Sequence, residues 1–212
     1  MSSRIVIYDE RLAGFAGDAA AEFEGMLGER PGVTVESPAE VQLDGDLVNV
    51  VLYVGDLVAS GVVGAMVAGG WQSAKKIFRK GVRDTRERGN ERGFQLQILP
   101  AGGKGGGLRL KNLDLESLES VDASDRFTEA QLRPFEEIVI PALRWWQDSS
   151  DPPSSVQVTA EIGSGRERAD GLWQVLLEFP DGETAAFSVE GDAVSWSGEP
   201  DRPVPAILLP RG

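Results

Sequence analysis

The stretch "GFQLQILPAGGKGGGLRLKNLDL", residues 93–115, places two alternating patterns on either side of a run of glycines. From Phe94 to Ile98 apolar and polar residues alternate, which is the period of a strand with one buried face. A glycine-rich loop at 100–107 follows, and the alternation resumes in the "LRLKNLDL" after it. The stretch therefore predicts two neighbouring strands joined by a hairpin loop.

The same loop also invites a phosphate-binding interpretation, because a lysine lies among its glycines. A Walker loop, however, places Ser or Thr directly after the lysine and a helix after the loop. Here Gly105 follows Lys104, and a strand pattern follows the glycines. A flexible hairpin loop is therefore the favoured interpretation of residues 100–107.

Strands and helices alternate on the N-terminal side of this hairpin. Residues 4–9 and 46–54 are rich in β-branched side chains and predict strands. A helix is expected over residues 18–30, with Asp18 as its N-cap. With a short strand and a second helix added, the order is β-α-β-β-α-β. This order predicts an α+β fold in which residues 1–125 form a split βαβ (ferredoxin-like) sandwich.

The pattern changes on the C-terminal side. Residues 126–149 predict a connecting helix, which Pro134 and Pro141 should kink or divide because proline donates no hydrogen bond. After a polar linker the apolar residues recur with a period of two. Residues 150–212 therefore predict a four-stranded antiparallel β-meander with an extended tail.

A meander of this size is marginal on its own, so its apolar face is expected to pack on the connecting helix through Trp145 and Trp146. The aromatic residues on that face are Trp173, Phe179, Phe187 and Trp196. They could instead form a stacking platform for bases or sugars. Their apolar neighbours and the acidic surroundings favour the core interpretation.

The composition excludes several kinds of chemistry. The chain of 212 residues contains neither cysteine nor histidine and has a net charge of −13. Disulfides, a thiolate nucleophile and a histidine base or metal ligand are therefore excluded. No catalytic residue, metal ligand or cofactor is assigned, and the acidic surface disfavours nucleic acid. The apolar run at residues 5–8 is too short for a signal peptide, so a cytoplasmic location is expected.

Residues 57–89, "LVASGVVGAMVAGGWQSAKKIFRKGVRDTRERG", combine an uncharged half with a basic half. In the uncharged half, 57–74, small residues recur four positions apart, which lets a helix approach a neighbour closely. The candidates for close packing are Ser60, Gly61, Gly64, Ala65, Ala68 and Gly69. Trp71 follows, where a residue at a membrane interface would lie. Pairing of such helices would also allow a homodimer.

The basic half concentrates positive charge on an acidic chain. Residues 75–92 hold eight Lys and Arg against three Asp and Glu, a local charge of +5. Spacings of three and four residues place these cations along one side of a helix. The predicted partner-binding residues are Lys75, Lys76, Arg79, Lys80, Arg83 and Arg86.

Three interpretations of this helix remain open. It could pack its small residues on the protein's own sheet, with its basic end balanced by acidic neighbours such as Glu22 and Glu24. It could present a binding face to an anionic partner. It could insert into a membrane, although glycine, serine and glutamine dilute the hydrophobicity of the uncharged half and disfavour insertion.

Together these features predict a non-enzymatic interaction or regulatory module whose basic face, residues 75–92, binds an acidic protein partner. One alternative is a magnesium-dependent enzyme that processes nucleotides or phosphoryl groups with Asp9 and Glu10, because magnesium needs only oxygen ligands. The other alternative is a protein that associates with membranes through the glycine-rich helix at 57–74.

Overall fold

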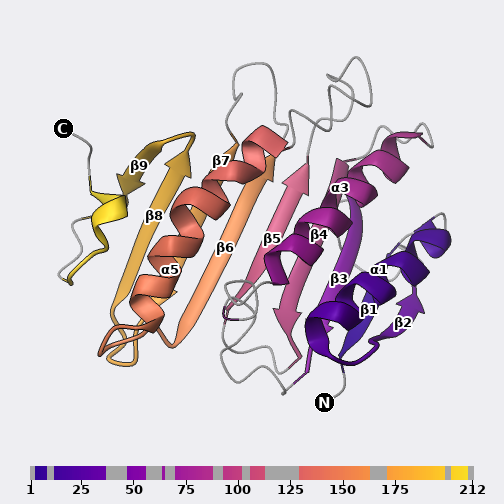
Figure 1. Cartoon of the computed structure of the whole chain (residues 1–212), viewed down its shortest axis with the longest axis horizontal. Helices are drawn as coiled ribbons and strands as arrows, with labels where there is room; N and C mark the ends of the chain where they lie inside the picture. Colours follow the sequence, from indigo (N-terminus) through magenta and orange to yellow (C-terminus); the bar gives the residue numbers. More distant parts are fainter. Residues whose placement is uncertain are drawn as a thin grey trace.

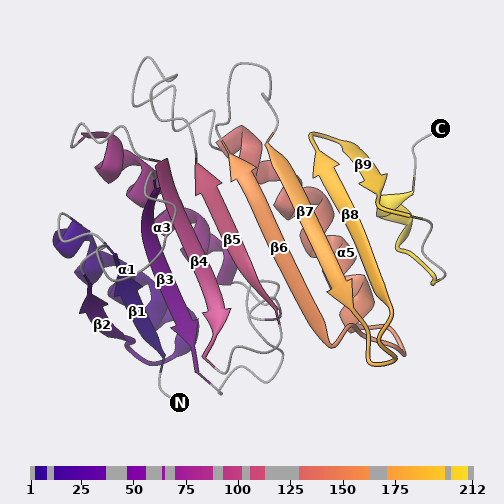
Figure 2. The same cartoon turned by 180° about the vertical axis from the view of Figure 1, so that it is seen from behind.

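The structure is a computed structural model that describes residues 3–8, 12–36, 47–55, 64, 70–87, 93–101, 106–112, 129–162, 171–198 and 202–209. Within these ranges, nine strands form one mixed sheet in the order β2-β1-β3-β4-β5-β6-β7-β8-β9. The helices α1, α3 and α5 lie along one face of the sheet, as Figures 1 and 2 show from its two sides. The described part of the chain is therefore an α+β fold of two layers.

The strands are β1 (Arg4–Ile7), β2 (Gly32–Val35), β3 (Leu47–Val54), β4 (Gly93–Pro100), β5 (Gly106–Asn112), β6 (Ser155–Ile162), β7 (Leu172–Glu178), β8 (Thr184–Glu190) and β9 (Ala193–Trp196). The helical elements are α1 (Ala13–Leu27), α3 (Trp71–Glu87), the π-helical segment η4 (Phe135–Val139), α5 (Ile140–Gln147) and the 3-10 turn η5 (Ala206–Leu208). Residues 129–134 are α-helical and lead directly into η4.

The first four strands form two parallel pairs of direct neighbours. β1 pairs in parallel with β2, and β3 pairs in parallel with β4, while β1 and β3 run antiparallel. In a split βαβ sandwich another strand would separate the members of each pair. The predicted ferredoxin-like arrangement is therefore not confirmed. Alternation along a strand shows which of its faces is buried, but it does not show which strand lies beside it.

One sheet also runs through both of the units predicted from the sequence. β5 pairs in parallel with β6 over the whole length of β5, from Gly106 opposite Val156 to Asn112 opposite Ile162. The predicted two-domain arrangement, with units at 1–125 and 150–212, is therefore not confirmed. Beyond this junction, β6, β7, β8 and β9 form the antiparallel meander that the alternation predicts.

The glycine-rich stretch lies at a hairpin. β4 and β5 are antiparallel neighbours on either side of it, which agrees with the hairpin interpretation of residues 100–107. Residues 102–105 of the loop lie outside the described ranges. Gly106 begins β5 with a φ of 78°, a left-handed conformation that favours glycine. A strand rather than a helix follows the glycines, as in the sequence pattern.

The helix before the meander is interrupted as its prolines predict. In η4, the N–H of Ile140 donates to the carbonyl of Phe135, five residues earlier. Pro141, in the first turn of α5, has no N–H to donate, and in a regular helix its ring would clash with the carbonyl of Glu137. The wider π turn is one way in which a helix accommodates such a residue.

An aromatic cluster joins the two halves of the molecule. The ring centroids of Trp71 and Phe135 are 4.3 Å apart, and those of Phe135 and Trp173 are 4.7 Å apart. Trp71 and Trp173 are 5.9 Å apart in an edge-on contact. Because α3, η4 and β7 each contribute one ring, these elements share a single core.

The other C-terminal aromatic residues also belong to the core. Phe179 and Phe187 are buried, as Trp173 is, and Trp196 is partly buried against the same cluster. The core interpretation of these rings is therefore confirmed. Of the two tryptophans expected to contact the meander, Trp146 is buried, whereas Trp145 is 41 % exposed.

Helix α3 packs closely against the sheet at Gly81. A Cβ atom at this position would lie 2.1 Å from Cζ of Phe94, the first large side chain of β4. Phe94 is fully buried, and its ring contacts the rings of Phe15 and Phe78. The absence of a side chain at Gly81 thus sets how closely α3 can approach β4.

Candidate functional site

The candidate site is the outer face of α3, and the inner face of the same helix explains how it is positioned. Trp71, Ala74, Phe78 and Val82 recur at spacings of three and four residues, and all are buried against the sheet. Lys76 and Arg83, on the other side of α3, are exposed to solvent. Trp71 is 2 % exposed and belongs to the core, as the interpretation of a helix packed on the protein's own sheet requires, and its ring does not lie where the membrane interpretation would place it.

The small-residue half of the predicted helix is largely outside the described ranges. Gly64 alone among its close-packing candidates is described, and it is helical and buried. Ser60, Gly61, Ala65, Ala68 and Gly69 lie outside. Their role in close packing remains a prediction. Among the residues that the structure describes, no helix is long and apolar enough to cross a membrane.

The basic half forms a hollow on the surface. The hollow has a volume of about 410 Å³, and its lining residues are Glu22, Gln72, Ser73, Lys75, Lys76, Arg79, Lys80 and Arg83. The structure therefore brings together five of the six predicted partner-binding residues. The sixth, Arg86, belongs to α3, but its side chain lies outside the described part of the structure.

The inner end of the hollow is a network of ion pairs with the helix at 129–139. Nζ of Lys75 contacts Oε1 of Glu129 and lies 2.9 Å from Oε1 of Glu136. Arg79 lies 3.0 Å from the other oxygen of Glu129. Glu136 also accepts a hydrogen bond of 2.7 Å from Nε1 of Trp71. The same contacts thus anchor α3, residues 129–139 and the aromatic cluster to one another.

Electrostatics holds this inner network in its charged form. Burial alone would lower the pKa of Lys75, but hydrogen bonds to Glu129 and Glu136 outweigh burial and raise that pKa above its ordinary value. Burial would likewise raise the pKa of Glu136, but hydrogen bonds from Lys75 and Trp71 lower it instead. The side chain of Lys75 is only 11 % exposed, so this ammonium group has little access to an external partner.

The outer end of the hollow faces α1. Nζ of Lys76 lies 2.5 Å from Oε2 of Glu22, which agrees with the expected balance by Glu22. Lys80 lies 3.1 Å from Asp18 and 3.3 Å from Asp84, and a hydrogen bond to Asp18 raises its pKa. The other expected neighbour, Glu24, is 3.8 Å from Arg30 instead.

The contact with Lys80 also corrects the predicted cap at Asp18. Helix α1 begins at Ala13, five residues earlier than expected, so Asp18 lies inside the helix. Its carboxylate is turned towards α3 and not towards the backbone of its own first turn. The apolar residues before Asp18, such as Phe15, belong to the buried face of α1 and extend the helix.

Two cations at the outer end remain accessible. The side chain of Lys76 is 71 % exposed despite its contact with Glu22. Arg83 is exposed, and no ion pair to it is present among the described residues. Exposed ion pairs contribute little to stability, so an incoming carboxylate can replace Glu22 at small cost. The hollow therefore has a fixed inner end and an exchangeable outer end.

A second hollow, which the sequence pattern did not single out, lies on the sheet face away from the helices. It measures about 350 Å³ and is lined by Tyr53, Leu99, Gly107, Arg109, Gln157 and Thr159, among others. Leu99, Gln157 and Thr159 alternate along their strands with the core residues Ile98 and Val158, so their side chains point to the opposite face. Arg109 lies on this face within hydrogen-bonding distance of Gln97, 3.4 Å away.

Asp9 and Glu10 lie outside the described ranges. Among the residues inside those ranges, no cluster of three or more His, Cys, Asp or Glu side chains is arranged to hold a metal ion.

Comparisons with protein-family models, with curated proteins and with solved structures found no match to this chain. The basic hollow, with its exposed Lys76 and Arg83, is the feature of the described residues that points to a function.

Proposed function

We propose that the protein is a cytoplasmic, non-enzymatic interaction module that binds an acidic segment of a partner protein in the basic hollow of α3. The observation that carries the proposal is the outer end of this hollow, where Lys76 and Arg83 stand exposed on one side of a helix. A carboxylate-bearing segment would take the place of Glu22 at Lys76 and would pair with Arg83.

The size of the hollow favours a short acidic segment. From Lys75 to Arg83 the helix rises by about 12 Å, which is the span of a few extended residues. The rest of the chain is strongly negative, because the net charge is −13 in spite of this basic patch. Charges further than about 10 Å away are largely screened at physiological salt. A short segment therefore meets mainly the local positive charge, whereas a long polyanion would meet the negative surroundings as well.

The inner cations serve this proposal by holding α3 in place. Lys75 and Arg79 share Glu129, and Lys75 also binds Glu136, so reversing the charge of Arg79 would disturb the core contacts of α3. A useful test has to alter only the outer end. The double variant Lys76→Glu with Arg83→Glu changes exposed groups alone.

The test is a titration of fluorescein-labelled poly-glutamate with the protein, followed by fluorescence anisotropy at low and at physiological salt. The wild-type protein should bind the peptide, and added salt should weaken the binding. The variant carrying Lys76→Glu and Arg83→Glu should bind at least about tenfold more weakly, because two attractive contacts become repulsive.

A matched control is available elsewhere on the surface. The side chains of Arg30 and Arg133 are 63 % and 61 % exposed, and among the described residues they lie 3.8 and 3.7 Å from Glu24 and Glu137 respectively. Arg30→Glu with Arg133→Glu changes the net charge by the same amount but leaves the hollow intact. Equal weakening in both double variants would show that only net charge matters. Absence of binding by the wild-type protein at low salt would refute the proposal directly.

A further inference from the structure

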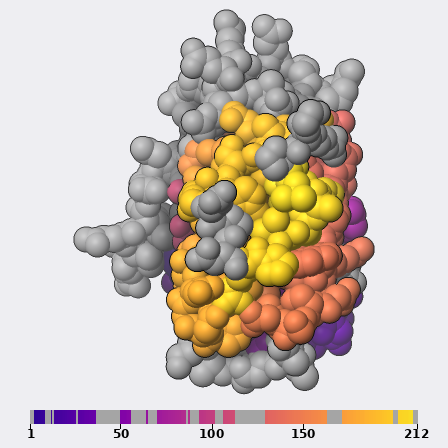
Figure 3. All heavy atoms as spheres, turned by 90° about the vertical axis from the view of Figure 1, so that its left-hand side faces the viewer, coloured from indigo at the N-terminus to yellow at the C-terminus, as the bar shows by residue number. Residues whose placement is uncertain are grey.

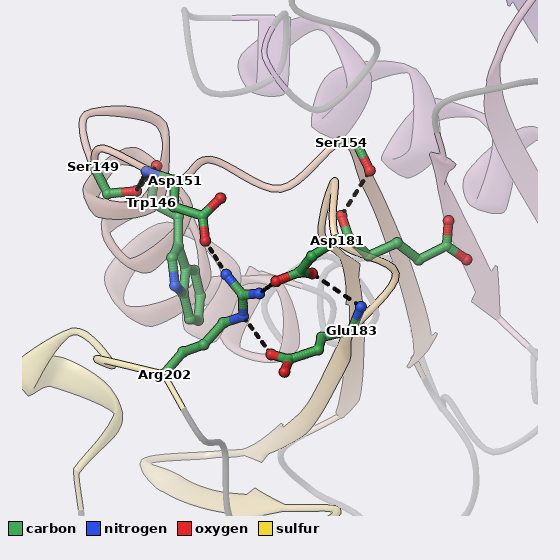
Figure 4. Close-up of polar contacts among 8 residues, drawn as sticks. Trp146, Ser149, Asp151, Ser154, Asp181, Glu183 and Arg202 are labelled. Atoms are coloured by element: carbon green, nitrogen blue, oxygen red, sulfur yellow. Dashed lines mark hydrogen bonds and ion pairs between the residues drawn. The ribbon is translucent and has the colours of Figure 1, made fainter.

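A second charged site surrounds Arg202, close to the C-terminal end of the chain. Its guanidinium contacts Asp151 through Nη1 and Asp181 through Nη2, and Nε lies 2.9 Å from Oε2 of Glu183. Figure 4 shows the three carboxylates converging on this one group from different directions. The guanidinium also lies over the ring of Phe179, 4.1 Å from its centroid. We call Asp151, Asp181, Glu183 and Phe179 the acidic slot.

The acidic slot is built by elements other than the segment that fills it. Asp181 and Glu183 belong to the turn between β7 and β8, where the N–H of Glu183 donates to Oδ1 of Asp181 over 3.0 Å. Asp151 follows α5, and its N–H donates to Oγ of Ser149. A local hydrogen bond thus positions the carboxylate of Asp181, and another fixes the backbone at Asp151. The three carboxylates come from the β7–β8 turn and from the end of α5, and not from the segment that carries Arg202.

The segment 202–209 is held mainly by side chains. Within the described ranges, its backbone–backbone hydrogen bonds stay inside the segment: the N–H of Leu208 donates to the carbonyl of Pro205, and the N–H of Leu209 donates to that of Ala206. Its second anchor is Leu208, which is fully buried and whose carbonyl accepts a hydrogen bond of 3.3 Å from Nε1 of Trp196. Figure 3 shows the C-terminal residues, in yellow, lying on the outside of the molecule.

The slot carries more negative charge than its occupant neutralises. Three carboxylates face one guanidinium, and each carboxylate side chain remains 52–54 % exposed. A hollow of about 270 Å³ adjoins the slot, with Trp145, Trp146 and Pro203 in its lining. Carboxylates and aromatic rings are the groups that a guanidinium pairs with and stacks on.

From these contacts we infer that the acidic slot is a recognition site for an extended, arginine-bearing protein segment, and that residues 202–209 of this chain occupy it in place of a partner. The partner segment would carry arginine followed by proline, and an apolar side chain six positions further on to replace Leu208. This site goes beyond the proposed function, because it selects a cation through a different surface.

The chemistry of the slot selects arginine rather than lysine. Three separate nitrogen atoms of Arg202 each contact a different carboxylate, while the flat face of the group stacks on Phe179. An ammonium group is a point charge without a flat face, so it cannot satisfy this arrangement. The attached segment competes strongly, because a tethered group has an effective concentration of about millimolar.

The test uses the full-length protein and a labelled peptide, RPVPAILL, with the sequence of residues 202–209. Arg202→Ala should empty the slot of its own arginine without removing a carboxylate. Fluorescence anisotropy should show that the peptide binds Arg202→Ala at least about tenfold more tightly than the wild-type protein, in which the slot is already filled. The peptide APVPAILL should not bind either protein.

Two further variants make the outcome decisive. Adding Asp181→Asn and Glu183→Gln to Arg202→Ala should abolish peptide binding, with circular dichroism confirming that the fold is retained. If Arg202→Ala does not fold, Arg202→Lys retains the charge and should still admit the peptide. Equal binding of RPVPAILL and APVPAILL would overturn the inference, as would failure of RPVPAILL to bind a folded Arg202 variant.

Discussion

Replacing Gly81 with alanine should destabilise the protein, although the same change stabilises most helices. Inside a helix, alanine is favoured over glycine by about 1 kcal/mol. Here the added Cβ would lie 2.1 Å from Cζ of Phe94 and no more than 2.5 Å from two further ring atoms. The ring cannot move aside freely, because Phe15 and Phe78 contact it at centroid separations of 6.1 and 5.7 Å.

The size of the effect follows from two opposing contributions. Forcing an extra methyl group into a packed core costs about 1–3 kcal/mol, and an overlap with a buried ring belongs at the upper end of that range. The helical preference for alanine offsets about 1 kcal/mol of this cost. Gly81→Ala should therefore lower the free energy of unfolding by about 2 kcal/mol.

Helix α1 provides a matched control at Gly17. This glycine is exposed, and no atom would lie within 4 Å of an added Cβ. Gly17→Ala should raise the free energy of unfolding by up to about 1 kcal/mol. Urea unfolding followed by circular dichroism measures both changes in unfolding free energy. The comparison requires that the slope of this free energy against urea concentration, the m value, is the same in the variants and the wild-type protein. If Gly81→Ala were as stable as the wild-type protein, α3 could not approach β4 as closely as described.

Two further predictions concern charge and backbone conformation. Glu136→Gln should destabilise the protein at neutral pH, because it removes the carboxylate that binds Lys75 and Trp71. The pKa of Glu136 in the folded protein lies below its ordinary value of 4.5. The difference in unfolding free energy between the variant and the wild-type protein should therefore disappear as the pH falls through that lower pKa. Urea unfolding at several pH values checks this, and a difference independent of pH would contradict it. Gly106 and Gly182 both have positive φ, so alanine is strained at either position. Of the two, only at Gly106 would an added Cβ meet a backbone atom, the oxygen of Val156 at 2.0 Å. Gly106→Ala should therefore lower the free energy of unfolding by about 1–3 kcal/mol more than Gly182→Ala does. Equal losses in thermal or urea unfolding would refute the close approach of β5 to β6.

The strands of the C-terminal half could be predicted from the sequence. β6 and β7 begin and end within a residue of the alternating patterns that predicted them, because burial of one face imposes a period of two. The interruption of the helix before them followed from Pro141. Here one local rule determines the structure, so a single sequence suffices.

The order of the strands in the sheet and the ion-pair partners of the charged residues could not be predicted from the sequence. Nothing in the local pattern places β1 beside β2, because pairing depends on surfaces that meet only in the folded chain. The basic face of α3 was visible as a cluster of cations, and Glu22 was a foreseen neighbour of Lys76. Glu129 and Glu136, which fix Lys75, lie more than fifty residues away from it along the chain. The sequence therefore located the basic hollow but could not separate its fixed inner cations from its accessible outer ones.

The most direct test of acidic-segment binding is an NMR titration of isotopically labelled protein with poly-glutamate at low salt. Amide shifts should concentrate in α3 between Gln72 and Arg83 and in the part of α1 around Glu22, because the peptide displaces Glu22 from Lys76. Shifts that cluster on other surfaces, or a spectrum that does not change, would contradict binding in the basic hollow.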